Sequence, residues 1–101
     1  MVQITERAST ELRRLLTDNF ARPQQGVRLR LKETGDLAMT IDVPHAGDSV
    51  IRRDNLPVLI VDGRLAVRLA QRVLDFPARS GAGFTLRWRA SLAIATPDET
   101  G

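Results

Sequence analysis

Two stretches of alternating apolar and polar residues, joined by a short turn, place the strongest constraint on the fold. In residues 27–32 and again in residues 37–43, large apolar side chains fall at every second position. A period of two is typical of a strand with one buried face. Thr34-Gly35-Asp36 supplies turn residues between the two stretches. The pattern therefore predicts an antiparallel hairpin whose apolar face needs a covering layer.

The best candidate for that layer is an amphipathic helix over residues 6–18. Thr5 is the expected N-cap, because its hydroxyl can accept a hydrogen bond from a free amide of the first turn. Glu6 follows, where a negative charge suits the helix dipole. The apolar residues at helical spacing form one stripe of Ala8, Leu12, Leu15 and Leu16. We expect this stripe to pack on a sheet whose inner face includes Leu29, Leu31, Met39, Ile41, Leu59 and Val61.

The rest of the chain reads as short strands and one short helix. Residues 49–51 and 58–61 are predicted strands, and the β-branched second one is expected to be central in its sheet. Residues 65–70 predict a short helix, and residues 73–76 and 84–89 predict a closing hairpin. The expected fold class is α+β, with the N-terminal helix packed on mostly antiparallel or mixed sheets and a second short helix.

The size and composition fit one globular domain. The expected domain spans residues 1–101, with its core over about 2–90 and a flexible tail over 91–101. Hydrophobic residues make up 43% and charged residues 27%, as in ordinary globular proteins. No apolar run approaches the roughly 20 residues of a membrane span, and the first 20 residues are rich in charge. We expect a cytoplasmic protein without a membrane partner.

Charge is unevenly distributed along the chain. The formal net charge is +3, and residues 1–35 and 63–101 are basic whereas residues 36–62 are acidic. Two interpretations stay open. The uneven charge can steer an acidic partner, or the segments of the chain can complement one another.

Several local patterns, in a fixed order, extend this description. Residues 4–8 and 12–16 open the first helix, and residues 26–31 form the first long strand. Proline, then Gly-Asp, then a strand occupy residues 44–50, followed by the strand of 56–62 and by the closing hairpin motifs of 73–76 and 81–84. Their order and spacing resemble the HesB/IscA family, the A-type iron–sulfur carriers, over roughly residues 2–88.

The resemblance stops at the residues that carry the family's chemistry. That family uses one cysteine in a Gly-Cys-Ser-Gly-like turn and two in a C-terminal Cys-Gly-Cys, but this chain has no cysteine. Its first turn is reduced to Gly35-Asp36, and residues 93–98 replace the second motif. Thiolates are the main ligands of iron–sulfur clusters, and an aspartate oxygen is a poor replacement. The resemblance thus implies the fold, and a non-catalytic accessory or interaction protein without cofactor or metal, with a link to iron–sulfur cluster assembly left open.

Two further groups of residues are weaker candidates for a site, because plain solvation explains them at least equally well. Asp36, with Asp98 and Glu99, is the candidate set for a carboxylate iron site, and solvated acids are the favoured alternative. His45 is the only histidine, with Asp42 and Asp48 as the nearest acids in sequence. A lone loop histidine is usually exposed, and catalysis would need a partner group within reach. No enzyme is therefore predicted.

The basic strand faces are the remaining candidate. Arg28, Arg30 and Lys32 share one predicted outer face, and Arg87 and Arg89 share another. If the two strands are neighbours, these five form one binding surface. The alternative function is accordingly a basic module for nucleic acid or another polyanion, although alternation places the aromatic side chains on the opposite face, away from stacked bases. A solvated face paired with the acidic middle segment is the other interpretation. A protein partner is expected, and homo-oligomer formation stays open.

Overall fold

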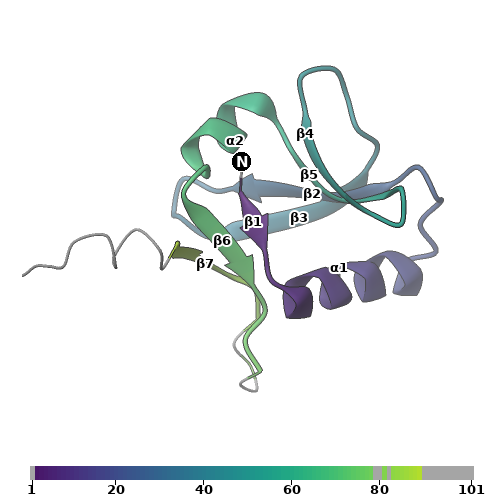
Figure 1. The fold of residues 1–101 in the computed structure, drawn as a ribbon, viewed down its shortest axis with the longest axis horizontal. Helices are drawn as coiled ribbons and strands as arrows, with labels where there is room; N and C mark the ends of the chain where they lie inside the picture. The colour runs from purple at the N-terminus through teal and green to yellow at the C-terminus, as the bar shows by residue number, and fades with distance from the viewer. Residues whose placement is uncertain (1, 79–80, 82, 90–101) are drawn as a thin grey trace, which may run out of the picture.

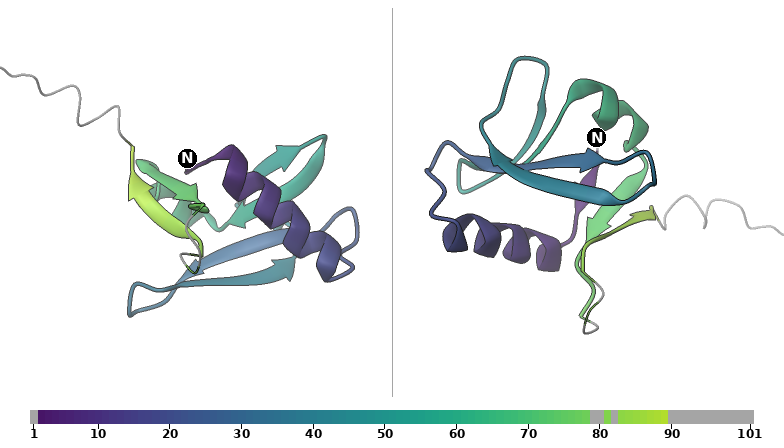
Figure 2. Two further views of the ribbon diagram at one scale, coloured as in Figure 1. Left: turned by 90° about the horizontal axis from the view of Figure 1, so that it is seen from below. Right: turned by 180° about the vertical axis from the view of Figure 1, so that it is seen from behind.

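The computed structural model describes residues 2–78, 81 and 83–89, which form two β-sheets and two helices (Figure 1). The longer helix lies across one face of the larger sheet, and the smaller sheet stands at the N-terminal end of that helix (Figure 2). This arrangement confirms the predicted α+β class with an N-terminal helix and a second short helix. The predicted tail, residues 91–101, lies outside the described residues.

The larger sheet has the strand order β3-β2-β5-β4. Its strands are β2 (Gly26–Leu31), β3 (Leu37–Asp42), β4 (Ser49–Arg53) and β5 (Leu56–Val61). The β2–β3 pair is the predicted antiparallel hairpin, and β5 takes the predicted interior position. β5 runs parallel to β2, so that Val27 lies beside Leu59. The sheet is therefore mixed.

The smaller sheet has the order β1-β6-β7 and consists of β1 (Gln3–Ile4), β6 (Arg72–Asp75) and β7 (Thr85–Trp88). β6 and β7 form the predicted closing hairpin, while β1 pairs with β6 in parallel. β7 is therefore not a neighbour of β2. The two basic strands lie in different sheets, and the single sheet face that would unite all five basic residues does not form.

Helix α1 (Glu6–Asp18) is fixed at its first turn. The Thr5 hydroxyl accepts a hydrogen bond from the Ala8 amide at 3.1 Å, as expected of an N-cap, and donates one to the Asp75 carboxylate at 2.7 Å. Because Asp75 lies at the end of β6, this contact ties the start of the helix to the smaller sheet.

The core lies between α1 and the inner face of the larger sheet. Leu12 is fully buried there, and both Leu29 and Leu59 belong to the same apolar cluster. Leu15 and Ile41 were expected to pack between the helix and the sheet, but they line a hollow at the edge of the sheet. The strand period assigned them to a face, but it could not show that the helix leaves that edge less completely covered.

Helix α2 (Gly63–Arg68) begins at an Asp62 cap, whose carboxylate accepts from the Leu65 amide at 3.0 Å. The loop after β3 touches its start, since a Cβ built on Gly63 would lie 2.9 Å from the Gly47 carbonyl oxygen. Glycine thus permits this close approach. Neither α1 nor α2, the two helices of the described residues, is long and apolar enough to cross a membrane.

Candidate functional site

A cleft of about 380 Å³ lies between the β2–β3 turn and the smaller sheet. The turn is the place where the family resemblance puts its first cysteine. More of the surface in the cleft is polar than apolar, and its lining consists of Leu31, Gly35, Asp36, Leu37, Arg72, Phe84, Thr85 and Leu86. One carboxylate and one guanidinium above apolar side chains suit the binding of a polar group, but they supply no thiolate.

The β2–β3 turn is closed by its own backbone. The Lys32 amide donates to the Asp36 carbonyl at 2.8 Å, and the Gly35 amide donates to the Lys32 carbonyl at 2.9 Å. Gly35 has a φ of +94°, which favours glycine. The Asp36 carboxylate accepts a hydrogen bond from the Thr34 hydroxyl at 3.0 Å. It therefore serves the turn, although it also faces the cleft.

Histidine, aspartate and glutamate are the metal-ligating residue types in the described ranges, residues 2–78, 81 and 83–89. Within those ranges, no three histidine, aspartate or glutamate side chains come together in a metal-binding group. Asp98 and Glu99 lie outside the described residues, as do residues 93–98. Of the candidate carboxylate set, the structure therefore describes Asp36 alone.

Sequence reasoning missed Arg72, on the opposite wall of the cleft. Its guanidinium carbon lies 4.5 Å from the ring centre of Trp88, its partner across the β6–β7 hairpin. Arg72 also donates from Nη2 to the Leu86 carbonyl at 3.0 Å. Trp88 is 66% exposed despite this contact. The signal that could have found Arg72 is its register opposite Trp88.

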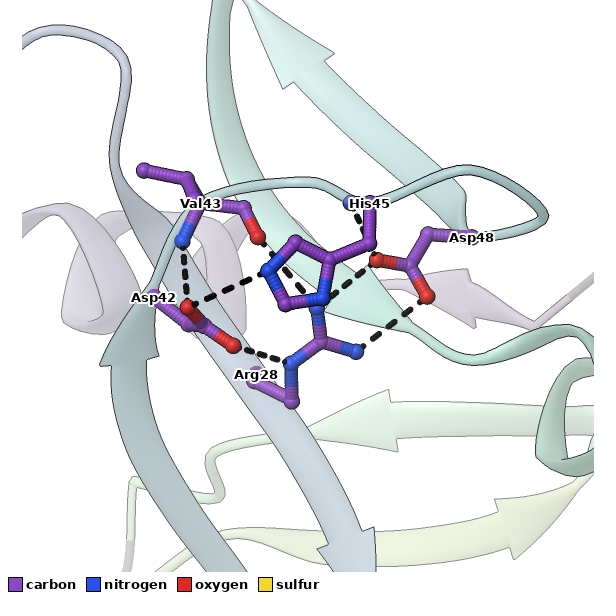
Figure 3. Close-up of polar contacts among 5 residues, drawn as sticks. All are labelled: Arg28, Asp42, Val43, His45 and Asp48. Carbon is purple, nitrogen blue, oxygen red and sulfur yellow. Dashed lines mark hydrogen bonds and ion pairs between the residues drawn. The ribbon is translucent and has the colours of Figure 1, made fainter.

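The most completely paired charges of the described residues surround Arg28, which is only 6% exposed (Figure 3). Its Nε donates to Asp42 at 2.6 Å, and its Nη2 donates to Asp48 at 2.7 Å. Nη1 reaches the other Asp48 oxygen at 3.2 Å, and Nη2 also donates to the Val43 carbonyl at 3.3 Å. Two carboxylates and one carbonyl therefore surround a single guanidinium and hold the loop after β3 against the sheet.

This pairing shifts the ionisation of both acids. Hydrogen bonds from Arg28, with a smaller one from the His45 amide, lower the pKa of Asp48 to about 2. The same guanidinium and the Val43 amide lower the pKa of Asp42. The carboxylates in turn raise the pKa of Arg28. All three groups stay charged near neutral pH, which is typical of a structural ion cluster and not of a proton-transfer site.

The prediction that Arg28 belongs to an exposed basic face is wrong. Strand alternation did place Arg28 on the face opposite Leu29, but the loop after β3 folds over that face and supplies Asp48. Arg30, Lys32 and Arg87 are exposed and Arg89 is half-buried. Arg87 lies 3.7 Å from the Asp75 carboxylate. The two basic groups thus belong to separate sheets and form no common face.

His45 lies on the loop, 61% exposed at its side chain. Its Nε2 is 3.8 Å from an Asp42 oxygen, and its backbone amide donates to Asp48 at 2.7 Å. Both carboxylates already bind Arg28. The structure therefore brings together the histidine and the two acids named from the sequence, but around a guanidinium.

Comparison with known proteins identifies the fold. No protein-family model matches the chain, and no curated protein matches it significantly. Among solved structures, Escherichia coli SufA, involved in biosynthesis of iron–sulfur clusters, superposes with a TM-score of 0.62 at 21% identity, covering 86% of this chain and 84% of SufA. A protein from Aquifex aeolicus gives 0.63 at 23% identity, covering 85% and 89%.

A third solved structure is IscA with a [2Fe-2S] cluster, which superposes with a TM-score of 0.55 at 22% identity and covers 88% of this chain and 84% of that protein. Likeness at these identities establishes architecture. The chain therefore has the HesB/IscA-like fold, which SufA and IscA share and which its sequence patterns resemble.

Proposed function

We propose that this chain is a non-catalytic interaction protein that keeps the HesB/IscA-like fold without carrying a thiolate-bound cluster. One observation carries the proposal: a carrier-like fold whose 101 residues include no cysteine. Iron–sulfur clusters are held mainly by thiolates. A chain with the carrier shape and without those ligands can still present a surface that partner proteins recognise.

The charged groups of the described residues support a non-catalytic role. The only histidine lies in the loop after β3, beyond the end of β3 that is remote from the cleft. The two acids beside it, Asp42 and Asp48, both bind Arg28. In the cleft, Asp36 accepts from Thr34 and Arg72 stacks on Trp88. These groups stabilise local structure.

The proposed partners belong to iron–sulfur cluster assembly. SufA is described as involved in cluster biosynthesis, and the IscA structure holds a [2Fe-2S] cluster. A cysteine-free protein of the same shape would act beside such carriers as an accessory protein, through protein contacts alone. Of the basic residues predicted to bind a partner, Arg30, Lys32, Arg87 and Arg89 are kept in this proposal.

Anaerobic reconstitution with ferrous iron and sulfide tests the first half of the proposal. We expect no stoichiometric cluster and no visible absorbance after desalting, whereas IscA, whose structure holds a [2Fe-2S] cluster, serves as the positive control when treated in parallel. A stable cluster on this chain would overturn the proposal. Affinity capture from the native cell extract tests the second half. Enrichment of iron–sulfur assembly proteins over an unrelated bait of equal charge supports it, and an identical set of captured proteins contradicts it.

A further inference from the structure

A second groove, of about 300 Å³, lies away from the cleft, where the C-terminal turn of α1 meets the β4–β5 hairpin. Figure 1 shows the hairpin turn and the loop after α1 at the same end of the molecule. Apolar side chains from both elements line this groove, namely Leu16 of α1 with Leu56 and Val58 of β5. Leu56 is 45% exposed. The groove therefore offers apolar surface to a partner.

Arginines surround this apolar surface. Arg13, Arg22 and Arg53 line the groove, and no carboxylate is among its lining residues in the described part of the chain. Arg13 pairs with Asp54 at 2.7 Å, but the two side chains are 48% and 75% exposed, so this pair is solvated and weak. Among the described residues, the Arg53 guanidinium donates only to the neighbouring Arg52 carbonyl. The groove thus has a net positive charge.

Phe20, which directly precedes the groove residues Ala21 and Arg22, is in an unusual state. Its side chain is 92% exposed and its φ is +55°. The Phe20 amide donates to the Thr17 carbonyl, and the Ala21 amide donates to the Leu16 carbonyl. These two bonds form a Schellman motif, whose left-handed position normally holds glycine. A bulky phenylalanine is strained there.

Within the described part of the chain, the Phe20 ring makes little contact with other residues. Its backbone conformation is one that glycine would adopt without a steric penalty. Residues with strained backbone conformations that the fold does not require occur most often at binding and active sites. Exposed aromatic residues beside arginines are also typical of the residues that dominate binding energy at protein interfaces.

We propose that this groove, together with Phe20 next to it in the chain, docks a short acidic segment of a partner protein that carries apolar side chains. The inference rests on the proposed function, because it names the surface through which an interaction protein would act. Apolar side chains of the segment would pack on Leu16 and Leu56. Its carboxylates would meet the arginines in paired hydrogen bonds, a geometry that guanidinium groups favour.

A displayed library of random dodecapeptides, selected on the full chain, provides the probe. We expect the selected peptides to be rich in aspartate or glutamate and in leucine or phenylalanine. Synthetic copies are then titrated at physiological salt by fluorescence anisotropy. Phe20→Gly and Arg22→Glu should each weaken binding at least about tenfold, because a tenfold change corresponds to the loss of one good interface contact.

Arg64→Glu is the matched control, since it makes the same charge change on the exposed side of α2 and should leave the affinity unchanged. Selection of neutral or basic peptides, or unchanged affinity for Phe20→Gly and Arg22→Glu, overturns the docking site. Self-association of the free chain that Phe20→Gly abolishes overturns it in favour of a second copy. None of these results depends on cluster reconstitution or protein capture, so the proposed function can stand or fail separately.

Discussion

Two neighbouring positions on opposite faces of the four-stranded sheet are buried by different chemistry. On the inner face, Leu29 and Leu59 are buried with Leu12 of α1 in a wholly apolar contact. On the outer face, Arg28 is nearly as buried, but its partners are polar: the Asp42 carboxylate at the end of β3, and the Asp48 carboxylate and Val43 carbonyl of the loop after β3. Adjacent residues of one strand, Arg28 and Leu29, thus depend on opposite kinds of burial.

The difference teaches how each face can fail. Apolar packing is non-directional, so a lost methyl group leaves a cavity around which neighbours can partly collapse. A buried ion cluster is directional, and loss of the cation leaves uncompensated carboxylates in a site with little water. The outer face should therefore be the more sensitive to a single substitution, and the only one of the two that responds to acid.

The largest expected effect is that of Arg28→Met, which keeps an unbranched apolar side chain but removes the charge. Asp48, whose side chain is 5% exposed, then loses its principal partner. Removing one member of a buried pair typically costs about 3–5 kcal/mol. Urea denaturation followed by circular dichroism measures the loss. The exposed Arg30→Met, two residues along the same strand, is the control, and equal losses in the two variants would refute a structural role for the cluster.

Next in size is Leu12→Ala on the inner face. Leu12 is fully buried against the sheet, and large-to-small changes at such sites typically cost about 2–5 kcal/mol. Arg14→Ala, on the exposed side of the same helix, should change stability far less, because its pairs with Glu11 and Asp18 are at the surface. Matching losses by chemical denaturation would mean that α1 does not dock through Leu12.

Low pH should reduce the stability contributed by the ion cluster on the outer face, but not that of the apolar inner face. The pKa of Asp48 falls to about 2 in the folded protein, from 3.8 for the unpaired group, so its contribution is complete above about pH 4. Stability should then decline as the pH falls from about 4 to 2, by roughly 1–2 kcal/mol from this group. The lowered pKa of Asp42 acts in the same direction.

Denaturation midpoints across this pH range measure the decline. Leu12→Ala should keep the acid slope of the wild-type protein, because it leaves the ion cluster intact. Asp48→Asn should flatten the slope, since the amide does not titrate. A slope that is equally steep in Asp48→Asn would assign the acid sensitivity to other carboxyl groups.

Local patterns in the sequence predicted much of this architecture. Alternation gave the β2–β3 hairpin, helical spacing gave α1 with Leu12 at its buried face, and Thr5 is the cap that its hydroxyl suggested. Each of these features depends on neighbours within a few residues. The parallel pairing of Gln3 with Val73 does not, because nothing local links residues so far apart.

The candidate site was less predictable for the same reason. Alternation gave the correct face for Arg28, but its burial depends on a loop that returns with Asp48. The open alternative that basic and acidic segments complement each other is confirmed at this pair. Trp88 faces away from Arg87, yet it is exposed, since alternation fixes direction and not cover. The stacking of Arg72 on Trp88 depends on the pairing of β6 with β7, which places the two residues opposite each other.

The smallest expected effect has the opposite sign and concerns Phe20, which neither kind of burial protects. Relief of the left-handed strain should raise the free energy of unfolding by about 1–2 kcal/mol. The greater freedom of glycine in the unfolded chain should lower it by about 0.5–1 kcal/mol. Phe20→Gly should therefore stabilise the protein by roughly 0.5–1 kcal/mol in urea denaturation. Phe20→Ala is the control, because it removes the ring but keeps the strain and should gain little. If Phe20→Gly lowered the stability, the ring would have a structural role in the fold, which would contradict its proposed role in binding a partner.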